Sequence, residues 1–114
     1  MLDLNMLDGF LASMMKSKTI RFLEELAGGP LTLGRFITAI REGEEASLVE
    51  FAKKLGISKS HLCDIEKDRK PVSAAKAAEM AHTLGYDEKQ FVQLALQDSL
   101  KRAGLAYEVK IEAA

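Results

Sequence analysis

The chain has 114 residues, of which 47% are hydrophobic and 29% are charged, and its formal net charge is −1. This balance predicts a folded domain and excludes a disordered or fibrous protein. No apolar run reaches the roughly 18 residues of a membrane span, and the first residues lack the basic start of a secretory signal. We therefore expect no membrane partner. One cysteine cannot form an internal disulfide, which fits the reducing cytoplasm, so we expect a cytoplasmic protein.

Charge is distributed unevenly along the sequence. Residues 53–76 contain seven Lys or Arg against three Asp or Glu, a net +4 within a chain of net −1. A local basic patch in a weakly acidic chain favours contact with phosphates without general stickiness. The alternative is an ordinary solvated surface of mixed charge.

The first 30 residues are predicted to form a helical extension. Residues 6–16 and 19–27 carry apolar side chains at helical spacing, and Gly28-Gly29-Pro30 ends the second helix. Methionines in this extension would make an adaptable apolar surface of the kind that protein partners use. Alternatively, these helices cover the protein's own core or a dimer seam.

Residues 31–104 are predicted to form the main domain, with five helices. Each predicted helix begins just after a small polar residue, whose side chain can accept a hydrogen bond from a backbone N–H of the first turn. Gly56 and Gly85 are placed to end two of these helices in the left-handed conformation. The five predicted capping residues are Thr32, Ser47, Ser58, Ser73 and Asp87.

The last segment, residues 105–114, changes to a period of two. Leu105, Tyr107, Val109 and Ile111 alternate with more polar residues, which predicts a β-strand with one buried face. A lone strand needs a partner for its backbone groups, and the same strand of a second copy is the simplest one. We therefore expect a homodimer; the alternative is a frayed tail.

Residues 47–73 read as two short helices joined by a tight turn. This arrangement can place the second helix in the major groove of DNA while the first crosses the backbone. At about 100° per residue, Leu62 and Ile65 lie on the buried side of the second helix. The opposite face then carries Lys59, Ser60, Cys63, Asp64 and Lys67.

The chain resembles the Xre/Cro-type helix-turn-helix family, the class of the phage repressors, from about Thr32 to Leu84. The resemblance rests on residue types in a fixed order, each of which is required by helix packing or by the turn between the helices. The matching residues are Phe51-Ala52, Leu55-Gly56-Ile57-Ser58, Leu62, Ile65 and Glu66. It implies an all-α, phage-repressor-like helix-turn-helix bundle, here with extra N-terminal helices and a C-terminal β-strand.

The resemblance also implies that bases are read from Lys59, Ser60 and Asp64. Lys59 would donate to guanine acceptors, and Asp64 would accept from a cytosine amine. We expect phosphates to be held near the ends of the two helices, where basic side chains and free backbone N–H groups gather. The predicted phosphate contacts are Ser47, Lys67, Arg69 and Lys70.

Two further features follow from the resemblance. In the family, an arginine on the preceding helix pairs with the glutamate that ends the recognition helix, which implies a structural ion pair between Arg41 and Glu66. The chain departs from the family at Leu48, where glutamine commonly touches phosphate, and at Asp68, where glycine is common. Aspartate tolerates the left-handed conformation better than most residues, so the turn at Asp68 can persist.

The predicted function is sequence-specific binding of double-stranded DNA by a dimeric repressor that reads a palindromic operator. The alternative is an antitoxin that binds its operator and neutralises a toxin through residues 6–27; a third is a domain used only for protein contacts. No catalytic motif occurs, and His61 and Cys63 point apart on their helix, so we expect no enzyme activity, metal or cofactor.

Overall fold

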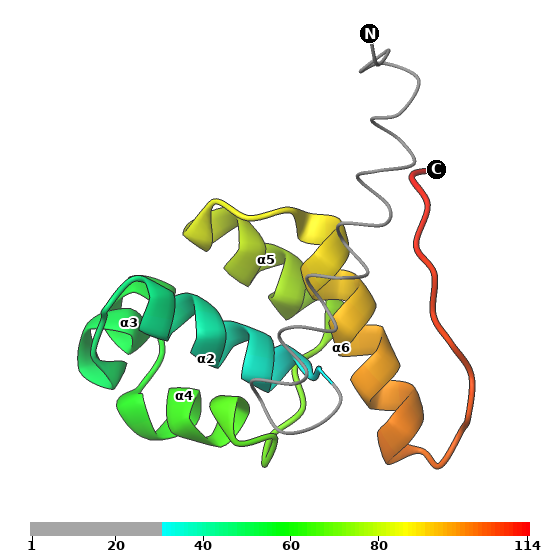
Figure 1. The fold of residues 1–114 in the computed structure, drawn as a ribbon, viewed down its shortest axis with the longest axis horizontal. Helices are drawn as coiled ribbons and strands as arrows, with labels where there is room; N and C mark the ends of the chain where they lie inside the picture. The colour runs from blue at the N-terminus through cyan, green and yellow to red at the C-terminus, as the bar shows by residue number, and fades with distance from the viewer. Residues whose placement is uncertain (1–30) are drawn as a thin grey trace, which may run out of the picture. The chain divides into compact units, whose positions relative to one another are not determined.

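The computed structural model describes residues 31–114, and within them Thr32–Ala114 form one compact unit (Figure 1). The helices predicted within residues 6–27 lie outside the described residues. No helix in the described part is long and apolar enough to cross a membrane. All regular secondary structure in the described part is α-helical, as predicted for residues 31–104.

Five helices make up the domain, and each begins after the predicted capping residue. In the first four, the hydroxyl oxygen of the cap accepts from the backbone N–H three residues later, and Asp87 accepts from the Lys89 N–H. These bonds satisfy N–H groups that have no partner inside the helix. The helices are α2 (Leu33–Gly43), α3 (Leu48–Leu55), α4 (Lys59–Glu66), α5 (Ala74–Leu84) and α6 (Glu88–Arg102).

Two of the helix ends follow the sequence prediction closely. Gly56 and Gly85 end α3 and α5 with φ of 70° and 76°, a region that disfavours side chains. The end of α2 differs, because Gly43 is its last helical residue and the left-handed residue is Glu45, with φ of 54°. Asp68, after α4, also has a positive φ of 58°, the conformation expected there.

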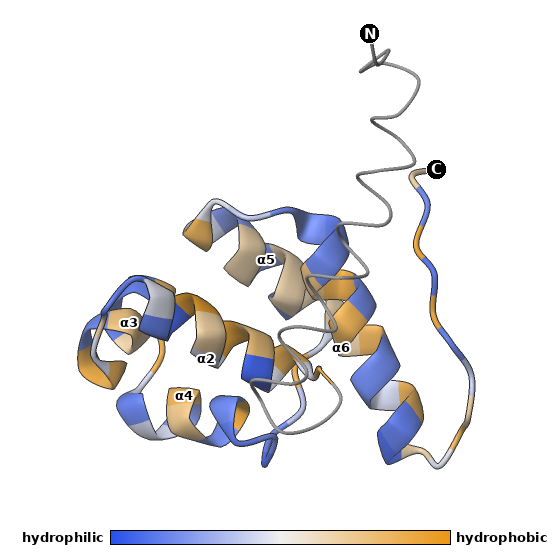
Figure 2. Ribbon diagram, in the orientation of Figure 1, coloured by the Kyte–Doolittle hydropathy of each residue, from blue (hydrophilic) through white to orange (hydrophobic). Residues whose placement is uncertain are grey.

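The core is apolar and receives side chains from all five helices. No polar or charged residue in the described part is buried. Phe91 of α6 meets Phe36 of α2 edge-to-face at a ring distance of 5.4 Å, and Tyr86 closes this aromatic group. Figure 2 shows the apolar residues gathered on the facing sides of the helices. The largest fully buried side chains are Leu33, Ile37, Phe51, Leu62, Met80 and Phe91.

The β-strand predicted for residues 105–114 is absent from the described chain, so that prediction is corrected. The segment runs back beside α6 without secondary structure (Figure 1). A strand requires a backbone ladder, and here the tail backbone bonds instead to the side chain of Gln97. Of the alternating apolar residues, Val109 and Ile111 are half-buried, whereas Leu105 and Tyr107 are exposed.

Candidate nucleic-acid interface

The α3–turn–α4 unit has the geometry that a helix-turn-helix requires. Ala52 is 2% exposed and is a small residue in the packed interior of α3. Gly56 turns the chain with a left-handed φ, and the Ile57 N–H donates to the Ala52 carbonyl at 3.0 Å. The chain then enters α4 through the Ser58 cap.

Helix α4 is anchored from behind by two residues, as predicted. Leu62 is 0% exposed and Ile65 is 3% exposed, which fixes the rotation of the helix about its axis. The opposite face is therefore turned to solvent. On it, Lys59, Ser60 and Lys67 are exposed, and Cys63 and Asp64 are half-buried.

Asp64 is held by basic residues that follow α4. Arg69 Nε donates to Asp64 Oδ1 at 2.9 Å, and Lys70 Nζ lies 3.8 Å from Oδ2. The same loop is pinned by backbone bonds, because the Arg69 and Lys70 N–H groups both donate to the Asp64 carbonyl. Asp64, predicted to read bases, is thus hydrogen-bonded to Arg69 and ion-paired with Lys70, both predicted to hold phosphates. In the free protein these three side chains form one group with a net charge of +1.

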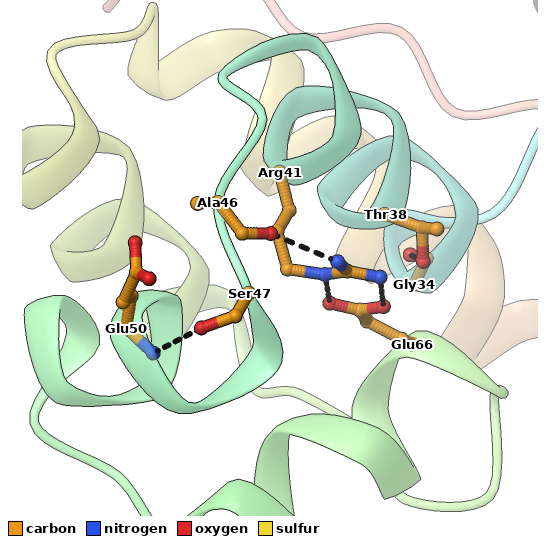
Figure 3. Close-up of polar contacts among 7 residues, drawn as sticks. All are labelled: Gly34, Thr38, Arg41, Ala46, Ser47, Glu50 and Glu66. Atoms are coloured by element: carbon orange, nitrogen blue, oxygen red, sulfur yellow. Dashed lines mark hydrogen bonds and ion pairs between the residues drawn. The ribbon is translucent and has the colours of Figure 1, made fainter.

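The second predicted phosphate position lies at the start of α3. Ser47 caps the helix through a 3.1 Å bond from the Glu50 N–H to its Oγ, as Figure 3 shows. The Ser47 hydroxyl is therefore engaged with the helix itself. Glu50 adds a negative charge in the first turn, which opposes the attraction of the helix N-terminus for an anion.

Arg41 and Glu66 form a two-pronged ion pair between α2 and α4. Arg41 Nε donates to Glu66 Oε2 at 2.8 Å, and Nη2 donates to Oε1 at 3.0 Å (Figure 3). The third nitrogen, Nη1, donates to the Ala46 carbonyl in the loop before α3 at 3.1 Å. The hydrogen bond to Glu66 raises the pKa of Arg41 above its ordinary value, so the guanidinium remains charged. One side chain thus ties α2, the entry to α3 and the end of α4.

Gly34 was not singled out in the sequence, yet it sets the distance between α2 and the end of α4. A Cβ added to Gly34 would collide with the Ile65 carbonyl oxygen and lie 2.6 Å from Asp68 Oδ1. The only signal in the sequence is a glycine in the first turn of a well-capped, amphipathic helix. Asp68 completes this junction by accepting from the Thr32 hydroxyl at 2.9 Å.

Asp98 of α6 is a second residue that the sequence did not reveal. Its Oδ2 accepts from the Leu33 N–H at 3.0 Å, so a carboxylate from the last helix supports the start of α2. Burial raises the pKa of Asp98 above its ordinary value of 3.8, partly offset by this hydrogen bond. The negative charge of Asp68 raises it further. The 65-residue separation explains why no local pattern could find the contact.

Comparison with known proteins agrees with this geometry. A family model described as a helix-turn-helix domain matches residues 32–94, more than half of the chain. An immunity repressor protein of Bacillus phage phi105 is 38% identical over 55 residues, which span 48% of this chain and 38% of that protein. No solved structure matches the chain. With α4 anchored by Leu62 and Ile65 behind a solvent-facing surface, the chain belongs to the Xre-type helix-turn-helix family of DNA-binding domains.

Proposed function

We propose that this protein is a homodimeric transcriptional repressor that reads a palindromic operator through α4. The observation that carries the proposal is the orientation of α4. Its two apolar residues are buried, so Lys59 and Ser60 stand exposed at its N-terminal end. In helix-turn-helix proteins this end of the recognition helix meets the base edges of the major groove.

Base reading would rest on Lys59 and Ser60, with Asp64 in a dependent role. Lys59 can donate to guanine O6 and N7, and Ser60 can donate or accept. Each good base contact discriminates by about 1–3 kcal/mol. Because Arg69 and Lys70 hold the Asp64 carboxylate, Asp64 must either keep these partners beside the DNA or exchange them for a cytosine amine.

Most of the affinity would come from phosphate contacts after α4. Lys67, Arg69 and Lys70 are all exposed and lie within four residues of one another. Contacts of this kind position a protein on the duplex without reading its sequence. We assign a smaller contribution to the N-terminus of α3, because Ser47 is engaged in capping and Glu50 repels an anion.

Repression would require two copies of α4 on one face of the DNA. A two-fold dimer places its recognition helices about 34 Å apart, one turn of duplex, and its operator is then palindromic. A dimer bound across a promoter would block access to it. The relative from phage phi105, an immunity repressor by its name, supports repression as the biological outcome.

The test is the affinity of the protein for duplex DNA as a function of salt, measured with a selected operator and with a scrambled duplex of equal length. The proposal expects a steep fall of affinity with salt for both duplexes and a marked preference for the operator at every salt concentration. A flat salt dependence with no preference would contradict it. The antitoxin alternative stays a prediction, since the segment expected to contact a toxin lies outside the described residues.

A further inference from the structure

Among the described residues, the hydrogen bonds between α6 and the tail backbone from Tyr107 to Val109 come from one side chain, Gln97. Gln97 Nε2 donates to the Tyr107 carbonyl at 2.8 Å, and Gln97 Oε1 accepts from the Val109 N–H at 2.8 Å. One side-chain amide thus binds two backbone groups that lie two residues apart on the same edge of the tail. A neighbouring parallel strand would make the same two bonds from its backbone. The tail is therefore presented as an extended segment with one edge occupied.

The other edge of the tail is open. In an extended backbone, the N–H and C=O groups of alternate residues point to opposite edges, so those of Ala106, Glu108 and Lys110 point away from Gln97. Among the described residues, none of these backbone groups has a hydrogen-bond partner. A row of unpaired backbone groups is a template for a further strand.

The apolar face of the same segment is only partly covered. Tyr107 is 67% exposed and Leu105 is 44% exposed, whereas Val109 and Ile111 are half-buried. An open edge beside exposed apolar side chains is a surface that a natural protein normally covers.

We propose that the open edge of residues 105–112 pairs in the antiparallel sense with the same edge of a second copy. This inference rests on the proposed function, which needs a two-fold dimer. A two-fold axis perpendicular to the tail would pair the segment with itself, which is the self-complementary contact of such dimers. The described chain supplies no other strand for this edge.

Charge favours one register of this pairing over its two neighbours. Only residues on the open edge can lie opposite one another as hydrogen-bonded pairs, so the register changes in steps of two. One register places Glu108 opposite Lys110 of the second copy, twice by symmetry. A shift in one direction places Glu108 opposite Glu108, and a shift in the other places Lys110 opposite Lys110. Opposite charges stabilise such cross-strand pairs and like charges destabilise them.

The favoured register also matches the apolar residues. It places Val109 opposite Val109 and Tyr107 opposite Ile111 of the second copy. Pairs of β-branched residues, and of an aromatic with a β-branched residue, are favourable across strands. Charge alone would also allow Lys110 opposite Glu112, but that register places Val109 opposite Ala113 and loses the pair of Tyr107 with Ile111. Charge and apolar pairing together therefore favour the register with Glu108 opposite Lys110.

The experiment is charge exchange at this pair, with the dimer dissociation constant of the full chain measured by sedimentation equilibrium. Glu108→Lys and Lys110→Glu should each raise that constant about tenfold or more, since each creates two like-charge pairs. The double variant should return to within about threefold of the wild type. An equimolar mixture of the two single variants should form a heterodimer, because every pair across it is attractive again.

Glu112→Lys is the matched control. It makes the same change of charge at the next hydrogen-bonded pair outward from the axis, opposite Ala106, and should not weaken the dimer. Circular dichroism should show the wild-type helix content in all variants, whose changed residues are exposed.

Single variants that dimerise like the wild type would overturn the pairing and leave a dimeric DNA-binding protein standing. Single variants that dimerise weakly, with no recovery of dimerisation in the double variant or in the mixture, would also overturn the pairing. A wild type that is monomeric without DNA would do the same. Recovery in a protein that shows no sequence preference on DNA would support the pairing and refute the proposed function.

Discussion

Arg41 on α2 holds both carboxylate oxygens of Glu66, the last residue of α4, at 2.8 and 3.0 Å. The two side chains are 16% and 7% exposed, so neither charge is fully solvated. Through its third nitrogen, Arg41 also bonds the Ala46 carbonyl ahead of α3. The pair therefore sets both helices of the helix-turn-helix against α2, and we infer that its role is to position the exposed face of α4.

Glu66→Ala should lower the free energy of unfolding by about 2–4 kcal/mol, because it leaves the guanidinium of Arg41 poorly solvated and without its carboxylate. Urea denaturation followed by circular dichroism measures this change. Glu44→Ala is the matched control, since it removes an exposed pair with Lys54 at 3.6 Å and should cost less than about 0.5 kcal/mol. Equal costs for the two variants would contradict the structural role of Glu66.

Gly34→Ala should destabilise the protein by about 1–3 kcal/mol, because the new methyl group meets the Ile65 carbonyl and the helices must move apart. Thermal unfolding of the variant measures the loss. Gly43→Ala is a control on the same helix, where an added Cβ meets nothing within 4 Å. That change should be neutral or slightly stabilising, since alanine favours a helix over glycine. A Gly34→Ala variant as stable as Gly43→Ala would show that the close approach is not needed.

Asp98 should make stability depend on pH in a definite direction. Its pKa is raised in the folded state, so the folded chain binds more protons than the unfolded chain just above pH 3.8. Its contribution is therefore most favourable below that pH and is lost as the pH rises through the folded pKa. Asp98→Asn keeps an oxygen acceptor for the Leu33 N–H and removes the titration. Its stability relative to the wild type should rise with pH across this window, measured by urea denaturation at each pH. Stability curves of the two proteins that run parallel with pH, or a relative stability of the variant that falls with pH, would refute the raised pKa of Asp98 in the folded state.

Asp64→Asn should increase affinity for DNA of arbitrary sequence. The change removes the only negative charge that pairs with Arg69 and Lys70 in the described chain and leaves both cations available for phosphate. Fluorescence anisotropy with a scrambled duplex at low salt should show binding several-fold tighter than that of the wild type, by roughly 1 kcal/mol. Asn is similar in size and still accepts a hydrogen bond, so the loop should keep its shape. Weaker binding to the scrambled duplex would indicate that Asp64 mainly holds the two basic residues in place.

The sequence predicted the parts of the fold that depend on local chemistry. Five capping residues, the glycine turns at Gly56 and Gly85, and the inward orientation of Leu62 and Ile65 are all confirmed, because each depends on neighbours within one or two turns of chain. Family resemblance pointed to Arg41 and Glu66, which the structure places in contact.

The features that the sequence did not reveal depend on distant segments. Gly34 is constrained by a carbonyl of α4, and Asp98 supports a helix that begins 65 residues earlier. The tail was predicted as a strand because its alternation is a local signal. Its actual partner in the chain is the Gln97 side chain, and no pattern of hydropathy contains that information.

The most direct test of the central claim is selection of bound duplexes from a random DNA library by the wild type, Lys59→Ala and Arg69→Ala. If α4 reads bases through its exposed face, the wild type enriches a two-fold symmetric motif. Lys59→Ala then loses preference at one symmetric pair of positions, whereas Arg69→Ala keeps the motif and binds all duplexes more weakly. A wild type that enriches no motif, or a Lys59→Ala variant that enriches the unchanged motif, would contradict the assignment of α4 as the helix that reads DNA.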